Sequence, residues 1–541
     1  MASPPAFDNP EPPSPLSDEK LTALSVRLDP IDWIVIGIYM LSMIVIGWWY
    51  SRRNRDGGDY VVGGRKMNPW TVGLSFFVAL FSTISYLAIP GEIVRYGPIV
   101  FSGLLAYPLI YFLVGWFIIP PFMKLNVNSG YELLESRLGV GPRMLGVTLF
   151  LLLRLLWMAV IIYATVDKVL VPLTGLPESA TPLLCLILAG LTIVYTTMGG
   201  LKAIVTVDVI QATLLFGGVI VSLILITYKL GGVHVWWPDT WPAHWPEARL
   251  IGRDGDNRAI LAAFISSLVW YTCTAGSDQM AVQRYLATRD VAGARKMLGV
   301  SLVASFCIKL LLSCLGLALM AYVVHNPSWL PGGALATGAA DQLFPRFIAT
   351  TLPVGFAGLI IAGLLAEAMN SLSSGMNAAS AVITTDLIAR FRRDKFSAGQ
   401  ELRLLRWISL IVGCVVVGLS VGVSYVQGNL LELIYKVVNL LTAPLFSLFF
   451  LAIFIRWATS LGALAGAASG IFVTVLINYW RELFTGLNQL FDLHLRTEPV
   501  ISFLWGTPLS LCIAILVGML ASLLPFGPTA AQRLTARPTR E

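Results

Sequence analysis

Long apolar runs recur along this chain, and they constrain its fold more than any other feature. Each run is roughly 18 to 25 residues long, and an α-helix of that length crosses the hydrocarbon core of a bilayer, about 30 Å thick. Only 12% of the 541 residues are charged, too few to cover a soluble surface of that size. The sequence therefore predicts an all-α integral membrane protein with about 13 transmembrane helices, at about 31–50, 70–91, 97–122, 144–168, 181–198, 204–228, 259–281, 297–324, 352–388, 404–426, 430–455, 459–480 and 500–524.

Lys and Arg gather on alternate connections between the predicted spans. With the N-terminus outside, the inward connections, in which we count Arg284, carry roughly twice as many of these residues as the outward ones. Because one missed span would invert every later connection, the pattern predicts a multi-pass protein of the cell (plasma or inner) membrane with a cytoplasmic C-terminus. The net charge of +7 then reflects topology, and it gives no reason to propose a nucleic-acid partner.

Several other classes of protein are disfavoured by what the sequence contains. The segment 1–30 is polar and has no apolar signal region, so we expect no cleaved signal peptide. All six cysteines fall in predicted spans without a CxxC pair, which argues against disulfides and a zinc site. All four histidines fall in outward loops, which excludes a histidine proton relay through the membrane. We find no Walker A motif, kinase signature or other sign of an enzyme, so a channel or a secondary transporter remains.

Two of the predicted spans are interrupted by polar residues. Ser82, Thr83 and Ser85 break the run 71–98, and a cluster from Thr272 to Gln279 breaks the run 268–286. A single Ser or Thr in a span often bonds the preceding turn or allows close helix packing. Clusters in separate spans instead favour broken helices, which form the ion and solute sites of many secondary transporters near the bilayer midplane.

A third span, within 353–395, carries its polar residues on one face. Glu367, Asn370, Ser371 and Ser374 follow one another at helical spacings of three and four residues. Polar groups in hydrocarbon are costly unless something polar faces them. A face rich in oxygen atoms opposite a broken helix suits a small hard cation, and sodium is the natural candidate.

Six stretches of the chain match a known pattern in register. They are VGLSFFVALFSTISYLAIPGEIVRYG (72–97), GYELLESRLG (130–139), VYTTMGGLKAIVTVDVIQ (194–211), SDQMAVQRYLATRDVAGARK (277–296), SSGMNAASAVITTDLIARF (373–391) and SLGALAGAASG (460–470). In this order they resemble the sodium:solute symporter family, which includes sodium-coupled sugar, proline, iodide, vitamin and monocarboxylate transporters. The resemblance implies sodium-coupled symport of a small organic solute into the cell by alternating access, by a protein that works as a monomer without an organic cofactor.

The same resemblance implies a ten-helix core built from two inverted five-helix repeats. The repeats would span about 70–228 and 259–455, with broken first and sixth core helices, one extra helix before the core and two after it. The expected organisation is a polar segment (1–30), an extra helix with its loop (31–69), the core (70–455), two C-terminal helices (456–524) and a cytoplasmic tail (525–541).

Carried over to this chain, the family's sodium site falls on five positions. They are the backbone carbonyls of Val78 and Phe81 and the side chains of Glu367, Asn370 and Ser371. The family usually has Ala or Ser, then Ser, then Ser or Thr at the last three positions, so only Ser371 fits its pattern. An amide oxygen at Asn370 still suits sodium, but Glu367 is unusual.

A lone carboxylate at the bilayer centre costs roughly 2.5–3.5 kcal/mol on insertion scales, so Glu367 needs an explanation. It could ligate sodium directly, or let a proton replace or accompany sodium. It could also pair with an intramembrane cation such as Arg154 or Lys309, or face a water-filled cavity. The sequence leaves these alternatives open, and with them a proton-coupled symporter.

The resemblance places the solute pocket beside the sodium site, between the two broken segments. Family positions that contact solute fall on Ser82, Ser85, Thr274, Asp278, Gln279, Lys309 and Asn439. A sugar would use neutral hydrogen-bonding groups and an aromatic platform, for which Tyr271 with Asn439 and Gln279 would serve. A carboxylate would use Arg154 or Lys309.

Asp208 matches an acidic family position associated with ion coupling, and we group Arg154 with it. The alternative for Asp208 is a carboxylate at a helix end near Lys202. A solute sensor on the same fold is a rival function, but its signature would be a large cytoplasmic output domain, and the tail 525–541 supplies none. Two broken helices disfavour a passive channel.

Overall fold

The structure is a computed structural model. It describes residues 28–54, 56–124, 129–171, 176–238, 240–247, 249–251, 259–329, 337–392, 396–423, 430–491, 497, 503–524 and 527–535. Of the predicted polar segment 1–30 only residues 28–30 are described, and of the predicted tail 525–541 only residues 527–535.

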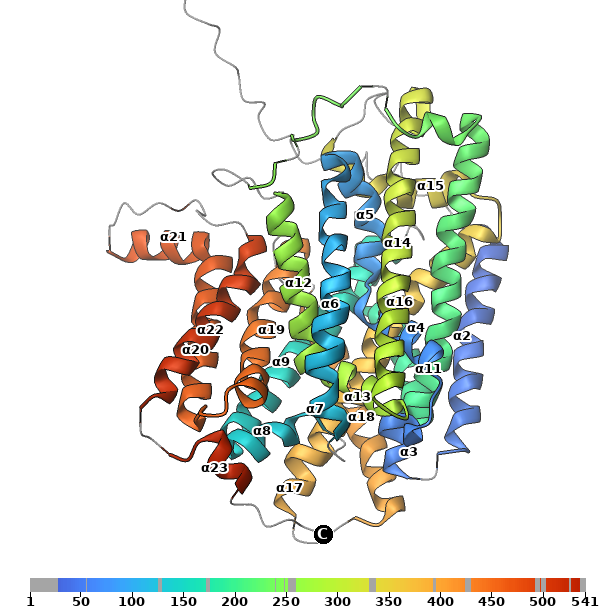
Figure 1. The fold of residues 1–541 in the computed structure, drawn as a ribbon. Helices are drawn as coiled ribbons and strands as arrows, with labels where there is room; N and C mark the ends of the chain where they lie inside the picture. The colour runs from blue at the N-terminus through green and yellow to red at the C-terminus, as the bar shows by residue number, and fades with distance from the viewer. Residues whose placement is uncertain are drawn as a thin grey trace, which may run out of the picture.

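Helices make up the fold, and no strand occurs among the described residues apart from one isolated bridge between Thr459 and Thr529. Figure 1 shows most of the helices side by side in one bundle, with α21 lying across their direction at one end. The α-helices are α2 (Pro30–Ser51), α3 (Gly57–Val62), α4 (Pro69–Leu80), α5 (Thr83–Tyr96), α6 (Tyr107–Leu113), α7 (Ile119–Lys124), α8 (Tyr131–Leu138), α9 (Val140–Thr165), α11 (Thr181–Leu230), α12 (Ile260–Ser277), α13 (Gln279–Ala287), α14 (Val291–His325), α15 (Leu343–Thr351), α16 (Phe356–Val382), α17 (Ala389–Phe391), α18 (Ala398–Val423), α19 (Leu430–Phe454), α20 (Ser460–Asn478), α21 (Trp480–Phe491), α22 (Gly506–Ser522) and α23 (Ala530–Thr535).

Many of these helices are long and apolar enough to cross a membrane. Within the described ranges there are nine such helices, or up to ten if the bent pair α4 and α5 is one span. The 50-residue helix α11 would be about 75 Å long at 1.5 Å per residue, more than twice the hydrocarbon core. It bends at Gly200, whose φ of 63° is accessible to glycine, so it accommodates two spans. The helical membrane fold is confirmed, whereas the count of 13 stays a prediction.

Both predicted helix breaks are present. Between α4 and α5 the chain turns by 69°, and Phe81 and Ser82 are extended there. The second break lies at Asp278, where the backbone is extended between α12 and α13. Helix α13 continues to Ala287, so Arg284 lies within a helix and is fully buried. Counting Arg284 as a charge of an inward loop was therefore wrong.

Helix α16 occupies the centre of the bundle. It packs against α2, α4, α5, α9, α11, α13 and α18, and every residue from Ile360 to Val382 is buried. An enclosed helix presents none of its faces to lipid, so its polar side chains must face other protein groups or enclosed space. The expected division into two inverted repeats and flanking segments stays a prediction.

Candidate functional site

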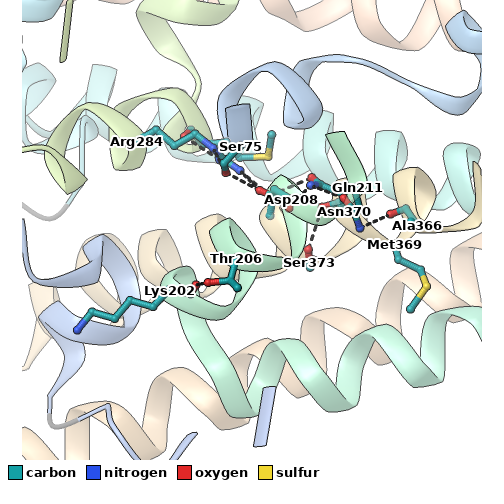
Figure 2. A network of polar contacts seen from close by, with 12 residues as sticks. Ser75, Lys202, Thr206, Asp208, Gln211, Arg284, Ala366, Met369, Asn370 and Ser373 are labelled. Atoms are coloured by element: carbon teal, nitrogen blue, oxygen red, sulfur yellow. Dashed lines mark hydrogen bonds and ion pairs between the residues drawn. The ribbon is translucent and has the colours of Figure 1, made fainter. Parts of the chain in front are cut away.

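A buried polar network lies where α4, α11, α13 and α16 meet, and Figure 2 shows it. Its centre is the carboxylate of Asp208, which accepts hydrogen bonds from the Ser75 hydroxyl and the Asn370 amide. Asn370 also donates to Gln211 at 3.1 Å, and Gln211 donates to the carbonyl of Ala366 at 2.9 Å. Ser75 from α4 and Asn370 from α16 therefore both donate to the carboxylate of Asp208 on α11.

Arg284 supplies the positive charge of this network. Its Nη2 lies 3.4 Å from Asp208 Oδ2 and donates to Ser374 Oγ at 2.9 Å, while its Nε donates to Ser75 Oγ at 3.0 Å. Buried charges are tolerated when they are paired and hydrogen-bonded, as both are here. Arg284 thereby ties α13, which follows one helix break, to α4, which precedes the other.

Lys202 does not belong to this network. Its Nζ donates to Asp59 at 2.7 Å, and Figure 2 shows its side chain extending away from Asp208. Asp208 is fully buried. The alternative in which Asp208 is a carboxylate at a helix end beside Lys202 is therefore wrong.

The five residues predicted to hold sodium fall on two facing segments. Val78 and Phe81 form the end of α4, where the N–H of Phe81 donates to the carbonyl of Val78 at 3.2 Å. On α16, neither carboxylate oxygen of Glu367 nor the hydroxyl of Ser371 has a hydrogen-bond partner among the described residues. Asn370 is directed differently, because its amide group binds within the Asp208 network.

Among the described side chains, no buried cation is paired with Glu367. Arg154 forms its ion pair with Asp278, and Lys309 donates to the hydroxyl of Tyr107 at 2.9 Å. Pairing of Glu367 with Arg154 or Lys309, one of the alternatives that the sequence left open, is therefore wrong. The carboxylate of Glu367 is fully buried, and no described side chain supplies a hydrogen bond or a positive charge to it.

A small cavity of about 40 Å³ lies between the two helix breaks. Three of the predicted residues, Arg154, Thr274 and Asp278, contribute to its wall. The full lining consists of residues from the α4 end, α9, the α12 end and α19: Ala79, Leu80, Leu153, Arg154, Trp157, Trp270, Thr274, Ser277, Asp278, Thr442 and Leu445. The cavity therefore lies where a solute pocket between the broken segments was expected.

The other predicted solute residues are not part of this lining. The hydroxyls of Ser82 and Ser85 bond each other at 2.9 Å, and Ser82 Oγ accepts the backbone N–H of Ser85 at 3.1 Å, which caps α5. The side chain of Gln279 accepts from the backbone of Gly130 at 2.9 Å. Tyr271 and Lys309 share a neighbour, because Tyr107 packs its ring 5.8 Å from that of Tyr271 and accepts from Lys309.

Asn439 lies in α19, but its side chain is not among those that the structure describes.

Three network residues were missed by reasoning from the sequence: Ser75, Gln211 and Arg284. The signal for Arg284 was available, because it lies in the matching stretch 277–296, shortly after the helix break. Its charge was assigned to a loop because charges cluster at span ends as well as at buried sites. Ser75 and Gln211 also lie in matching stretches, 72–97 and 194–211, and Gln211 follows Asp208 by one helical turn, but neither segment indicates that the two side chains meet in one network.

Comparisons with known proteins give a consistent result. A model of the sodium:solute symporter family matches residues 60–470 of this chain. The chain is 28% identical over 469 residues to the sodium/sialic acid symporter SiaT of Proteus mirabilis, which covers 84% of this chain and 90% of that protein. It is 27% identical over 485 residues to the human sodium-coupled monocarboxylate transporter 1, covering 86% of this chain and 76% of that protein.

Among solved structures, the fold resembles a substrate-bound, outward-open state of a sodium-coupled sialic acid symporter. The TM-score is 0.81 and the sequence identity 27%, over 93% of this chain and 98% of that one. The likeness extends beyond the segments around the helix breaks to nearly the whole chain.

Proposed function

Because the chain belongs to the sodium:solute symporter family, as its six matching stretches predict, we propose that it carries a small organic solute into the cell together with sodium, by alternating access. The placement of sodium rests on the carboxylate of Glu367. It is fully buried, and neither oxygen has a hydrogen-bond partner among the described residues. An ionised carboxylate in such a place requires a compensating positive charge.

Sodium is the cation that the surroundings of Glu367 suit. The unpartnered hydroxyl of Ser371 lies one turn further along α16 and adds a neutral oxygen ligand. The first residue of α5, Thr83, donates to the carbonyl of Leu364 at 3.0 Å, which holds the α4/α5 break against this part of α16. The carbonyls of Val78 and Phe81 then complete a set of oxygen ligands of the kind that hard cations prefer.

A proton is the second candidate for the coupling ion, and the same observation favours it. A proton on Glu367 would neutralise the carboxylate as sodium does, without needing Ser371 or the carbonyls at the break. The two candidates differ in their ligands. Sodium binding requires several oxygens together, whereas protonation requires the carboxyl group alone.

For the solute, the relatives favour a carboxylic acid, which includes acidic sugars, over a neutral sugar. The two relatives described above are a sialic acid symporter and a monocarboxylate transporter by name. In this chain the cavity between the helix breaks contains a guanidinium, that of Arg154, which suits a carboxylate. We therefore place the solute in this cavity, with its acidic group at Arg154, and Asp208 with Arg284 in the coupling network beside it.

The transporter acts as a monomer in the cell membrane, with its N-terminus outside and its C-terminus in the cytoplasm. It catalyses no reaction, takes no organic cofactor and binds no nucleic acid. Its core is the segment 70–455, with the sodium and solute sites between the two repeats.

The experiment is uptake into proteoliposomes under an imposed sodium gradient, an imposed proton gradient, or neither. The probes are radiolabelled N-acetylneuraminic acid and lactate, together with radioactive sodium for direct binding. We expect uptake to follow the sodium gradient. Loss of a charged ligand in Glu367→Ala and Glu367→Gln is expected to weaken sodium binding roughly 10- to 100-fold.

Ser222→Ala is the control, because Ser222 is buried and its hydroxyl donates to the carbonyl of Gly218 in the same helix, α11. It should leave sodium binding unchanged. Uptake that follows the proton gradient alone would overturn sodium coupling and favour protonation of Glu367. Uptake that ignores both gradients would instead support a channel, and binding without uptake would support a sensor.

A further inference from the structure

The wall of the cavity contains an ion pair that spans two helices. Arg154 comes from α9, and Asp278 lies at the break between α12 and α13. Both side chains are nearly inaccessible, 7% and 4% exposed, and Arg154 Nη2 bonds to Asp278 Oδ2. Unlike Asp208 and Arg284, which are surrounded by protein groups, this pair borders open space.

Asp278 has little freedom to move away from the cavity. Its second carboxylate oxygen accepts the backbone N–H of Met280 at 2.8 Å and thereby caps α13. Arg154 is less committed, because its Nε has no hydrogen-bond partner among the described residues. The pair therefore combines a fixed acceptor with a guanidinium that has an N–H donor to spare.

The cavity is too small for an organic solute as it stands. A volume of about 40 Å³ suffices for a water molecule, whereas solute sites usually occupy several hundred Å³. Binding must widen the cavity, and a solute carboxylate at Arg154 would place two anions beside one cation, so that Asp278 would share the guanidinium charge with the solute. If Asp278 lost its cation and gained nothing, a buried charge would be left uncompensated, which is strongly unfavourable.

We propose that the Arg154–Asp278 pair selects acids that carry a hydrogen-bond donor beside the carboxylate, such as hydroxy acids and amino acids. The carboxylate binds Arg154, and the adjacent hydroxyl or ammonium group donates to Asp278 in place of the guanidinium. The indole rings of Trp157 and Trp270 line the same cavity and provide apolar surface for the carbon skeleton. This proposal rests on the proposed function in one respect: the transported solute occupies this cavity.

The selectivity follows from the cost of unpaired polar groups. A plain carboxylate engages Arg154 but offers no donor to the Oδ2 atom of Asp278, and a neutral sugar gives Arg154 no anion. Sites built to hydrogen-bond a substrate group discriminate strongly against analogues that lack it. Because the hydrogen bond involves a charged acceptor, we expect donor-bearing acids to bind at least about 10-fold more tightly than matched acids without the donor.

The test is calorimetric binding to the purified full-length protein in saturating sodium, with two matched series. The first compares propionate, lactate and alanine, and the second compares N-acetylneuraminic acid with its 2-deoxy analogue. In at least one series the donor-bearing acid should bind at least about 10-fold more tightly. Equal binding of propionate and lactate and of the two sialic acids, or no binding of any donor-bearing acid, would overturn the proposal.

Asp278→Asn tests the assigned residue, because an asparagine oxygen can still cap α13 while it no longer requires a donor. We expect the preference for lactate over propionate to fall to about 1-fold. The control is Asp290→Asn, which changes the same residue type at another helix start, where Asp290 accepts from Gly293 at 2.7 Å. It should leave the preference unchanged. If Asp278→Asn does not fold, the wild-type ratios still decide.

The outcomes also separate this proposal from sodium coupling. A preference for donor-bearing acids, with affinities that stay the same when sodium is removed, supports the selectivity of the pair while contradicting sodium coupling. Sodium-dependent binding of propionate and lactate with equal affinity supports sodium coupling and refutes the selectivity.

Discussion

The Asp208–Arg284 pair gives the sharpest energetic test of the buried network. Both side chains are fully buried, and their closest charged atoms lie 3.4 Å apart. Asp208→Asn leaves Arg284 with neutral acceptors only, namely Ser75, Ser374 and a backbone carbonyl. Arg284→Gln leaves the carboxylate with the neutral donors Ser75 and Asn370. In each case a charge stays buried without its partner.

Removing one member of a buried ion pair costs about 3–5 kcal/mol. Because several neutral hydrogen bonds survive here, we expect each single substitution to lower the free energy of unfolding by about 3 kcal/mol. The double substitution Asp208→Asn with Arg284→Gln removes both charges and leaves none unpaired. It should therefore lower the free energy of unfolding by about 3 kcal/mol, rather than by the sum of the two single costs. The difference, a coupling energy of about 3 kcal/mol, measures the interaction between the two charges.

The assay is unfolding of the purified protein by SDS in mixed micelles, followed by tryptophan fluorescence, for the wild type and all three variants. The matched control is the pair Lys202–Asp59, which is 2.7 Å apart but partly exposed, with 27% and 19% of the side chains accessible. Its coupling should stay below about 1 kcal/mol. Additive single costs at Asp208 and Arg284, within about 0.5 kcal/mol, would refute the reasoning.

Three further predictions concern stability. Gly200→Ala should lower the free energy of unfolding by about 1–3 kcal/mol, because φ is 63° and an added Cβ would lie 2.7 Å from the ring of Tyr60. The control is Gly217→Ala, where an added Cβ would have no atom within 4 Å, and the free energy of unfolding should change little in the same SDS titration. Asp32→Ala should lower the free energy of unfolding by about 1–3 kcal/mol, because one carboxylate oxygen of Asp32 accepts two backbone N–H groups near the start of α16, at 2.7 and 2.8 Å. Differential scanning fluorimetry should show a lower Tm, and an unchanged Tm would contradict this. Sodium at 100 times its Kd should stabilise the protein by about 2.7 kcal/mol, and a Tm equal in sodium and choline would argue against a sodium site.

The positions of the helix breaks could be predicted from sequence, because local chemistry determines them. Ser82 and Asp278 each cap the helix that follows the break, and capping residues inside apolar runs are visible in the sequence. The polar face of α16 was visible for the same reason, since the spacing of Glu367 and Ser371 is a property of one helix.

The partners of these groups could not be predicted, because they depend on which helices meet. Arg284 and Asp208 are 76 positions apart, and nothing in either segment specifies the other. The same limit explains why the sequence offered Arg154 to Glu367, whereas the fold gives it to Asp278. The cations Arg154, Arg284 and Lys309 and the acids Asp208, Asp278 and Glu367 allow several pairings, and only the packing of the helices selects among them.

Ligation of sodium by Glu367, as proposed, would also determine which step of a transport cycle the membrane voltage affects. A sodium site made only of hydroxyl and carbonyl oxygens becomes positive when the ion binds, whereas a site that includes the ionised Glu367 becomes neutral. A voltage of 100 mV contributes about 2.3 kcal/mol for each charge that crosses the membrane. Before the charge of the solute is counted, an inside-negative voltage would therefore drive the outward return of the empty, negatively charged site rather than the inward movement of the loaded one.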